Sequence, residues 1–372
     1  MDPYALGYRL YTWFETYSHD YFRKKYARVY STGQLNDAKK NYPNWKTLTE
    51  EQKKEIAAYW GLEHPVESDF MTHEIMLNAR EKFDVSYVPE KIYRLYLDPG
   101  LADRQLLMAW DDKNYFERHQ PSLPFPYTYV RNVNGWFLDH DYRHITEEEA
   151  KKIMLEHLPL IVKPSLKSGE GKNLRLLSDE KDVEKVFTDY DKNYLVQEKL
   201  TQCEVFEKTN PHSVNAMRIV TAIVNGEAKF LSGMLLTNTT DAIACNTNKA
   251  PGEGVFCIGI DGDGRFADTG YFENAKPLQT LPNGFTFSGM QVPSYKEAVK
   301  LAVEAHESMP MLGIIGWDIT IDKDNQPIII EWNLRGIGMY HSQLTTGPLF
   351  GEYSDYFAGI ARKMIQKKQN HL

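Results

Sequence analysis

The chain has 372 residues, 42% hydrophobic and 25% charged, which is typical of a globular protein with room for two or three domains. The net charge of −8 argues against a nucleic-acid-binding protein, which should carry a basic excess. Three scattered cysteines favour neither a disulfide framework nor a zinc site. We find no run of about 18 uncharged apolar residues and no signal-peptide pattern, so we expect a cytoplasmic protein without a transmembrane segment.

The first 100 residues are predicted to be mainly helical. Thr49 and Gln52 have the spacing of a capping box at the start of one helix. Residues 4–26 are rich in aromatic side chains at helical spacing, and basic residues follow at 23–28. Such a helix would suit a membrane surface, but packing against the rest of the protein is the simpler interpretation.

From about residue 101 the pattern changes to mixed helices and strands. "LPLIVKP", which ends at Pro164, and "YLVQEKL", which starts at Tyr194, are predicted strands, and Thr146 with Glu149 predicts another capped helix. Residues 216–272 alternate short β-rich runs with Gly, Asn and Asp turns, which predicts an antiparallel sheet. A helix at residues 293–309 and a C-terminal helix complete an α+β fold.

The stretch "GWDITIDKDNQPIIIEWNLRG", which starts at Gly316, predicts a hairpin with a four-residue loop at 323–326. In this register Asp318 faces Glu331, and Asn333 points to the same side. Two opposed carboxylates repel, and Mg²⁺, which prefers oxygen ligands, would remove the repulsion. A solvated strand face is the alternative. The predicted core face holds Trp317, Ile319, Ile321, Ile328, Ile330 and Trp332, whereas Thr320 would pair with Ile329.

Two segments carry candidate phosphate-binding groups. Lys163 ends an apolar strand, where a lysine is costly unless it reaches an anion or solvent. The loop that follows contains lysines and glycines, which suits a flap over phosphates, although a basic β-hairpin turn would look the same. Its candidate residues are Ser168, Gly169, Gly171 and Lys172.

Two further strands carry polar residues that could contact a nucleotide. Gln197 and Glu198 end an apolar strand, from which the chain could present backbone groups to an adenine edge, or simply run out into solvent. Arg218 lies within an apolar strand. A buried arginine usually binds a carboxylate or phosphate, so a phosphate contact and a salt bridge to a core acidic residue are equally compatible with the sequence.

Taken in order, these motifs resemble the ATP-grasp superfamily and, more narrowly, the sugar-transfer-associated ATP-grasp family. The resemblance covers roughly residues 101–350 and rests on Asp112–Lys113, "VKP…SGEGK", "VQEKL", "NPHSVNAMRIVT", "IGWDITI" and "PIIIEWNLRG". It implies an ATP-grasp fold over 101–372, preceded by the helical region 1–100. Within it we expect a flap subdomain at about 145–210, and an antiparallel-sheet subdomain at 211–372 with the metal site and the C-terminal helix.

The resemblance also implies roles for individual residues. Lys113 and Lys163 would hold ATP phosphates beneath the Gly169–Lys172 flap. The adenine hinge would be Gln197, Glu198, Lys199 and Leu200. The Mg²⁺ ligands would be Asp318, Glu331 and Asn333.

Three more residues would act at the reacting groups. Arg218 and Arg335 would face the transferred phosphate and the acyl phosphate. In "ACNTNKAPGEG" the chain departs from the family pattern, because Cys245 stands where an Asp is usual, so Asn246 is the remaining candidate.

By this resemblance the protein is an ADP-forming carboxylate–amine ligase that uses ATP and Mg²⁺ and forms an acyl phosphate. The acid would be a small-molecule or saccharide-linked carboxylate in surface polysaccharide biosynthesis, and the acceptor an amino acid or small amine. A kinase for a small-molecule hydroxyl, a peptide-forming amino-acid ligase and a binding protein without catalysis are the alternatives. A homo-oligomer is left open.

Overall fold

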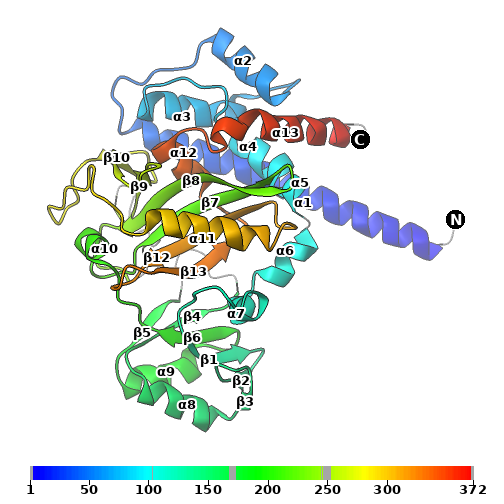
Figure 1. The fold of residues 1–372 in the computed structure, drawn as a ribbon. Helices are drawn as coiled ribbons and strands as arrows, with labels where there is room; N and C mark the ends of the chain where they lie inside the picture. The colour runs from blue at the N-terminus through cyan, green and yellow to red at the C-terminus, as the bar shows by residue number, and fades with distance from the viewer. Residues whose placement is uncertain (1–2, 103, 167–172, 244, 246–252, 370–372) are drawn as a thin grey trace. The chain divides into compact units, whose positions relative to one another are not determined.

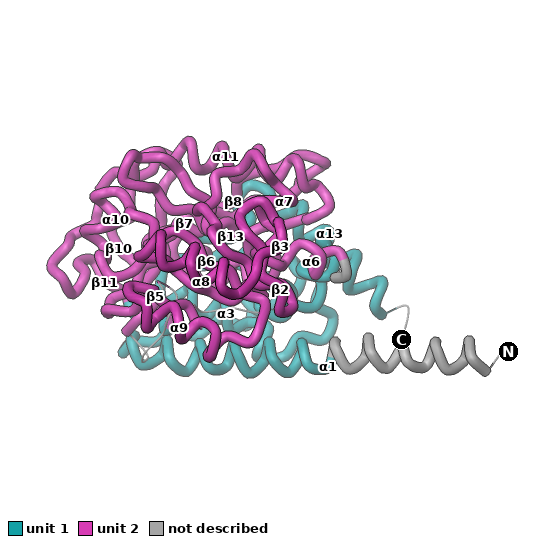
Figure 2. The backbone as a smooth tube through the Cα atoms, turned by 90° about the horizontal axis from the view of Figure 1, so that it is seen from below, with its two compact units in different colours: residues 1–103, 274–276, 347–372 teal, residues 104–273, 277–346 magenta. Residues whose placement is uncertain are grey.

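The computed structural model describes residues 3–102, 104–166, 173–243, 245 and 253–369. The chain forms two compact units (Figure 2). The first contains residues 1–103, 274–276 and 347–372, and the second contains 104–273 and 277–346. The C-terminal helix, which we predicted as part of the ATP-grasp region, therefore clusters with the helical N-terminal region instead.

The first unit is helical, as predicted for the N-terminal region. Thr49 and Gln52 form the predicted capping box, each side chain accepting a hydrogen bond from the other's backbone N–H. Trp60, at the end of that helix, is fully buried. The helices are α1 (Pro3–Lys39), α2 (Glu50–Trp60), α3 (Met71–Ala79), α4 (Glu90–Ile92), α5 (Asp98–Leu101) and α13 (Ser354–Gln369), with short turns η1 (Glu67–Asp69), η2 (Tyr93–Leu97) and η5 (Gly351–Tyr353).

Over residues 21–39, helix α1 buries only part of its surface. Ala27, Leu35 and Ala38 are buried, whereas Phe22 and Val29 are 64% and 63% exposed. Packing within the protein therefore accounts for one face of this helix. Within the described residues, none of the helices combines the length and apolar character that a membrane span needs.

The second unit begins with a six-stranded sheet that positions half of the site. Its strand order is β3-β2-β1-β6-β4-β5, and helices α8 (Glu147–Glu156) and α9 (Glu180–Asp189) contribute to the apolar core on one face (Figure 1). The sheet starts at residue 128. The strands are β1 (Thr128–Val133), β2 (Trp136–Leu138), β3 (His144–Ile145), β4 (Leu160–Pro164), β5 (Arg175–Leu177) and β6 (Tyr194–Glu198).

A seven-stranded antiparallel sheet forms the rest of this unit, with the order β11-β10-β9-β8-β7-β12-β13. The strands are β7 (Ala216–Val224), β8 (Glu227–Asn238), β9 (Val255–Ile260), β10 (Phe266–Phe272), β11 (Pro277–Leu278), β12 (Ile314–Ile321) and β13 (Pro327–Asn333). The unit's other helical segments are α6 (Arg104–Trp110), η3 (Lys113–Tyr115), α7 (Phe116–His119), α10 (Glu204–Thr209), α11 (Tyr295–Glu307) and α12 (Met339–Thr346). The predicted α+β class is confirmed.

The β12–β13 hairpin has the predicted Asp318–Glu331 pair, but a β-bulge changes the register nearer the loop. Ile319 pairs with Ile329, and Thr320 with Ile328. The prediction that Ile328 and Ile330 belong to the core face is therefore wrong. Because a bulge adds one residue to one strand, it exchanges the faces: Ile329 is fully buried and Ile330 lines a cavity.

Candidate active site

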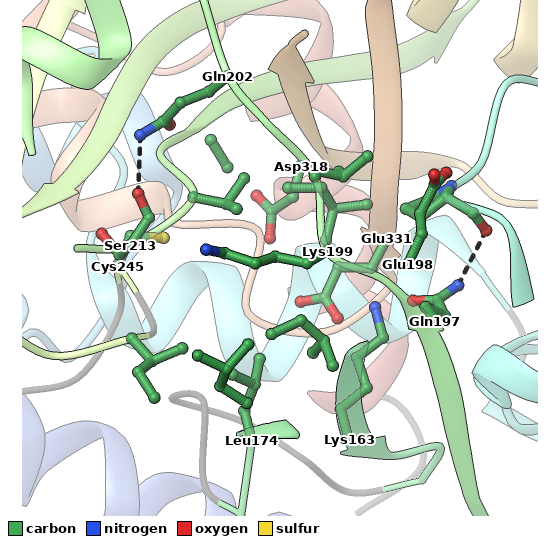
Figure 3. A pocket seen from close by; sticks show the side chains of 18 of the residues that line it. Lys163, Leu174, Gln197, Glu198, Lys199, Gln202, Ser213, Cys245, Asp318 and Glu331 are labelled. Carbon is green, nitrogen blue, oxygen red and sulfur yellow. Dashed lines mark hydrogen bonds between the residues drawn. The ribbon is translucent and has the colours of Figure 1, made fainter. Parts of the chain in front are cut away.

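A cavity of about 280 Å³ lies between the two sheets of the second unit. In Figure 3 the amine of Lys163 and the carboxylates of Asp318 and Glu331 surround the same space. Strands β4 and β6 form one side, and β12 and β13 the other. The apolar part of the wall includes Ile161, Leu174, Leu176, Ala216, Ile243 and Ile330.

Lys163 is a buried cation on the cavity wall. It is the penultimate residue of β4 and is only 8% exposed. Burial lowers the pKa of Lys163 to about 8, and the carboxylate of Glu331 acts against this shift. An additional anion in the cavity would favour the charged ammonium, so the site is electrostatically suited to a phosphate.

Lys113 and Glu331 form an ion pair across the cavity. Their charged atoms, Nζ and Oε2, are 3.0 Å apart. The backbone N–H of Lys113 donates to the carbonyl of Ser165, just after β4, which ties this residue to the first sheet. Burial raises the pKa of Glu331, but the charges of Lys113 and Lys163 outweigh this effect and lower it, so Glu331 is ionised at neutral pH.

Asp318 is held by an arginine on the neighbouring strand. Nε and Nη2 of Arg218 donate to the two carboxylate oxygens at 2.6 and 3.0 Å, and the Asn333 amide donates to Oδ2 at 3.1 Å. Burial raises the pKa of Asp318, although the guanidinium stabilises the charged form. Of the two interpretations open for Arg218, the structure contains the salt bridge.

Arg218 needs space beside two glycines. A Cβ atom on Gly316 would lie 3.1 Å from the Cδ of Arg218, and one on Gly338 would lie 3.1 Å from its Nη1. Gly338 also has a φ of +82°, which disfavours other residues. The carbonyl of Gly336 accepts a hydrogen bond from Nη1 at 3.3 Å. The "LRGIG" loop therefore packs around the arginine.

The predicted hinge residues Gln197, Glu198, Lys199 and Leu200 all line the cavity. The carboxylate of Glu198, however, accepts a hydrogen bond from the backbone N–H of Tyr127 at 2.7 Å. This carboxylate therefore has a structural contact within the first sheet. The ladder between β4 and β6 ends at Glu198, beyond which the chain leaves the sheet.

Asn215 of the "NPHSVN" motif is a structural residue. It is fully buried, and its amide donates to the carbonyls of Phe206 and Asn210 and to the side chain of Gln202. Its own side-chain oxygen accepts from Thr237. Asn215 therefore fixes the loop that brings His212 and Ser213 to the cavity wall.

Arg335 and Cys245 are the remaining predicted residues that the structure describes. Arg335 is exposed on the loop after β13. Ser168, Gly169, Gly171, Lys172 and Asn246 lie outside the described residues. Cys245 does line the cavity, but burial raises the pKa of its thiol to about 12. A neutral thiol is a poor nucleophile, in keeping with the doubt about an acceptor role for Cys245.

The donor atoms fit a hard divalent cation. Asp318 and Glu331 supply carboxylates, and Asn333 supplies an amide oxygen because its NH₂ group already donates to Asp318. Among the described residues, no group of three His, Cys, Asp or Glu side chains is placed to hold a metal. A cation here would therefore depend on Asn333 and on oxygen atoms from a substrate or water.

The family comparison agrees with these motifs. A family model described as "Sugar-transfer associated ATP-grasp" matches residues 186–352. The predicted family resemblance is confirmed. The ATP-grasp match includes Arg218, Asp318 and Glu331, whereas Lys113 and Lys163 precede it and reach the cavity through the fold. No curated protein matches the chain significantly.

Several solved structures are similar to this chain. The biotin carboxylase domain of Hydrogenobacter thermophilus 2-oxoglutarate carboxylase, with MgADP, ADP and bicarbonate, has 13% identity, a TM-score of 0.41 and coverage of 68% of this chain and 46% of that chain. The D-alanine-D-alanine ligase from Coxiella burnetii has 14% identity, a TM-score of 0.40 and coverage of 72% of this chain and 61% of that chain. The L-amino acid ligase from Bacillus licheniformis has 16% identity, a TM-score of 0.37 and coverage of 70% of this chain and 48% of that chain. The chain spans about half the length of the first of these proteins.

Proposed function

We propose that this protein is an ATP- and Mg²⁺-dependent, ADP-forming ligase that joins a carboxylate to an amine through an acyl phosphate. The observation that carries the proposal is the cavity itself. It combines Lys113, Lys163, two opposed carboxylates and the end of β6 with the apolar walls that a nucleotide base requires. The ATP-grasp match over residues 186–352 supports the same activity.

In this proposal the base of ATP lies between Ile161 and Ile330, beside the chain that follows Gln197, and the phosphates extend toward Lys113 and Lys163. Lys163 approaches Glu331 from β4 of the first sheet, and Lys113 approaches it from the turn η3. They would neutralise phosphate charge without needing any covalent role, which suits phosphoryl transfer. Lys163 contributes most as a desolvated cation, since burial strengthens its attraction to an anion.

Glu331 and Asn333 would hold Mg²⁺, with Asp318 as a third oxygen donor. When bound, Mg²⁺ supplies positive charge that neutralises the phosphates of the nucleotide. Arg218 orients Asp318 by a bidentate contact and prevents it from turning away from the cavity. Arg218 therefore positions a carboxylate, and the remaining assignment of Arg335 to the acyl phosphate stays a proposal.

The reaction proceeds by a phosphoryl transfer followed by an acyl transfer. A carboxylate oxygen of the acid attacks the γ-phosphorus, and the bond from that phosphorus to the β-phosphate oxygen breaks and releases ADP. The amine then attacks the acyl carbon, inorganic phosphate leaves with the acyl oxygen, and the amine loses a proton. The low-polarity walls near Ile161 and Ile330 would help to exclude water from the acyl phosphate.

For the substrates we propose a saccharide carboxylate, such as a uronic acid of a surface polysaccharide precursor, and an amino acid or small amine. The description of the matching family, which associates it with sugar transfer, supports this choice. A reaction that consumes ATP fits the cytoplasm. A kinase that phosphorylates a hydroxyl and a peptide-forming ligase remain the competing activities.

Hydroxylamine trapping tests the proposal. The protein is supplied with Mg²⁺-ATP, hydroxylamine and, in separate reactions, free uronic acids, nucleotide-linked uronic acids or amino acids. A ligase forms a hydroxamate and ADP in equal amounts with its own acid. A stable phosphorylated product without hydroxamate would identify a kinase, and a hydroxamate from amino acids alone would identify a peptide-forming ligase.

A further inference from the structure

Helix α1 exposes aromatic and apolar side chains on the face opposite its buried one. It packs against α3, α4, η1 and η2 of the same unit, and its buried residues are Ala27, Ser31, Gln34, Leu35 and Ala38. A rotation of about 100° per residue places Phe22, Tyr26 and Val29 on the other side. Each of these three side chains, which we call the apolar stripe of α1, is more than half exposed.

The apolar stripe differs from the rest of the described surface. Tyr21, Phe22, Tyr26 and Val29 are all exposed within residues 21–29, whereas elsewhere in the described chain large apolar side chains are exposed one at a time. Single exposed apolar residues are ordinary, but a contiguous group marks a surface that binds something. The described part of α1 belongs to the first unit (Figure 2).

Tyr26 is held in place on this face. Its ring stacks on that of Tyr30, with the ring centres 5.7 Å apart, and the guanidinium of Arg94 lies 4.6 Å from the centre of the Tyr26 ring. Arg94 is itself ion-paired with Glu90. A tyrosine that is already fixed loses little side-chain entropy when its exposed edge enters a ligand surface.

A basic stripe, formed by Lys24, Lys25 and Arg28, runs along the helix beside the apolar one. All three side chains are exposed, whereas Arg23 is partly buried, with its guanidinium 3.8 Å from the carboxylate of Asp98. Residues 21–36 contain four basic residues and no acidic one, although the whole chain has a net charge of −8. The long stems of Lys and Arg let the charges extend beyond neighbouring apolar groups. The exposed face is therefore complementary to a surface that is both apolar and anionic.

We propose that the exposed face of α1 binds an anionic phospholipid surface, with the helix lying in the plane of the membrane. Phe22, Tyr26 and Val29 would enter the boundary between head groups and acyl chains, where aromatic side chains are favoured. Lys24, Lys25 and Arg28 would contact the lipid phosphates. This surface is separate from the candidate active site, and the inference does not rest on the proposed ligase activity.

The charge pattern disfavours a second copy of the chain on this face. A two-fold dimer brings the same patch of both copies together. The basic stripes would then approach each other, and like charges repel. Anionic head groups instead neutralise the basic stripe while the acyl chains cover the apolar one, so a lipid surface satisfies both features.

The first test uses the unmodified protein. Its co-sedimentation with phosphatidylcholine vesicles is measured with and without phosphatidylglycerol, at low and at high salt. We expect phosphatidylglycerol to strengthen binding roughly 10- to 100-fold, as for three basic side chains near an anionic surface, and high salt to weaken it. Equal binding to neutral and anionic vesicles, or to neither, would overturn the proposal.

The second test removes each stripe in turn. The combined variant Lys24→Gln, Lys25→Gln and Arg28→Gln should weaken binding to phosphatidylglycerol vesicles about 100-fold, at about fivefold for each basic side chain. The combined variant Phe22→Ser and Val29→Ser should weaken it roughly tenfold or more, because two apolar side chains no longer insert. Thermal unfolding checks that these exposed substitutions leave the fold intact.

A matched control separates local charge from net charge. Lys54, Lys363 and Lys367 are exposed on α2 and α13, and replacing all three with Gln removes the same amount of charge from the protein. This control should retain binding. Equal weakening by the control and by the α1 variant would show a general charge effect and contradict the role of α1.

Self-association is the competing outcome. Analytical ultracentrifugation of the wild type, without lipid, would detect it. A dimer that Phe22→Ser with Val29→Ser dissociates, together with no vesicle binding by the wild type, would identify the face as an interface between copies and overturn the proposal. Vesicle binding and hydroxamate formation are separate measurements, so failure of the ligase proposal leaves this one unaffected, and the reverse is also true.

Discussion

Replacing Asp318 with Asn should destabilise the nucleotide-free protein. Asp318 and Arg218 are 6% and 7% exposed, and the substitution would leave the guanidinium buried without its counter-charge. Breaking a buried ion pair on one side costs about 3–5 kcal/mol, and because the Asn oxygen still accepts one hydrogen bond we expect about 3 kcal/mol. For a unit of this size that loss corresponds to a decrease in Tm of about 6–12 °C.

Thermal and urea unfolding of the Asp318→Asn variant in EDTA at pH 7 would measure this effect. Asp324→Asn, on the exposed loop of the same hairpin, is the matched control and should change stability by less than about 0.5 kcal/mol. The double variant Asp318→Leu with Arg218→Met removes both charges and should recover much of the loss. If repulsion between Asp318 and Glu331 were the dominant effect, Asp318→Asn would instead stabilise the nucleotide-free protein. An Asp318→Asn protein at least as stable as the wild type would therefore show that repulsion dominates and refute the ion-pair reasoning.

Three further variants test the site and its surroundings. Lys163→Met should weaken ATP binding about 10- to 150-fold in calorimetry, as for the loss of one charge-assisted contact, and leave adenosine binding unchanged; equal weakening of both would place Lys163 away from the phosphates. Burial lowers the pKa of His306 to about 4, so between pH 6.5 and 4 only the unfolded state takes up its proton. The free energy of unfolding therefore decreases as the pH is lowered, by up to about 1.4 kcal/mol per pH unit from this residue. His306→Gln should make the pH dependence of urea unfolding less steep over this range, by up to about 1.4 kcal/mol per pH unit, and an unchanged slope would contradict the buried neutral imidazole. Cys245→Ala should retain ADP release within about threefold, because burial keeps the thiol protonated; a loss of about 100-fold would assign it a catalytic role.

The sequence by itself determined the features that depend on neighbouring residues. Alternation along the strands and a polar loop predicted at 323–326 led to the Asp318–Glu331 pair, which the structure contains. The predicted loop register was wrong, because Pro327 pairs with Ile321 and not with Asp322, and the bulge restores the register before Asp318. Capping residues likewise marked the start of the helices at Thr49 and Thr146. Such signals are readable because side-chain direction within one strand or one helical turn follows from backbone geometry alone.

Only the tertiary structure decided which strand would lie beside the hairpin. Arg218 could have met a phosphate or a core carboxylate, and the choice was made when β7 paired with β12 and placed Arg218 next to Asp318. In the same way Lys113, far from Glu331 in sequence, reaches it through the first sheet. No local pattern encodes a pairing between residues 100 or more positions apart.

The bulge in β13 shows most clearly what could not be predicted from the sequence. Alternation predicted Ile330 in the core and Ile329 opposite it, and one extra residue reversed both positions. The sequence "PIIIEW" has apolar side chains on both sides of the strand and so contains no signal for the bulge. Packing determined which side of β13 faces the core. Ile329 lies beside Ile319 in the core, while Glu331 stays opposite Asp318. The register of a strand is specified by what each of its faces buries.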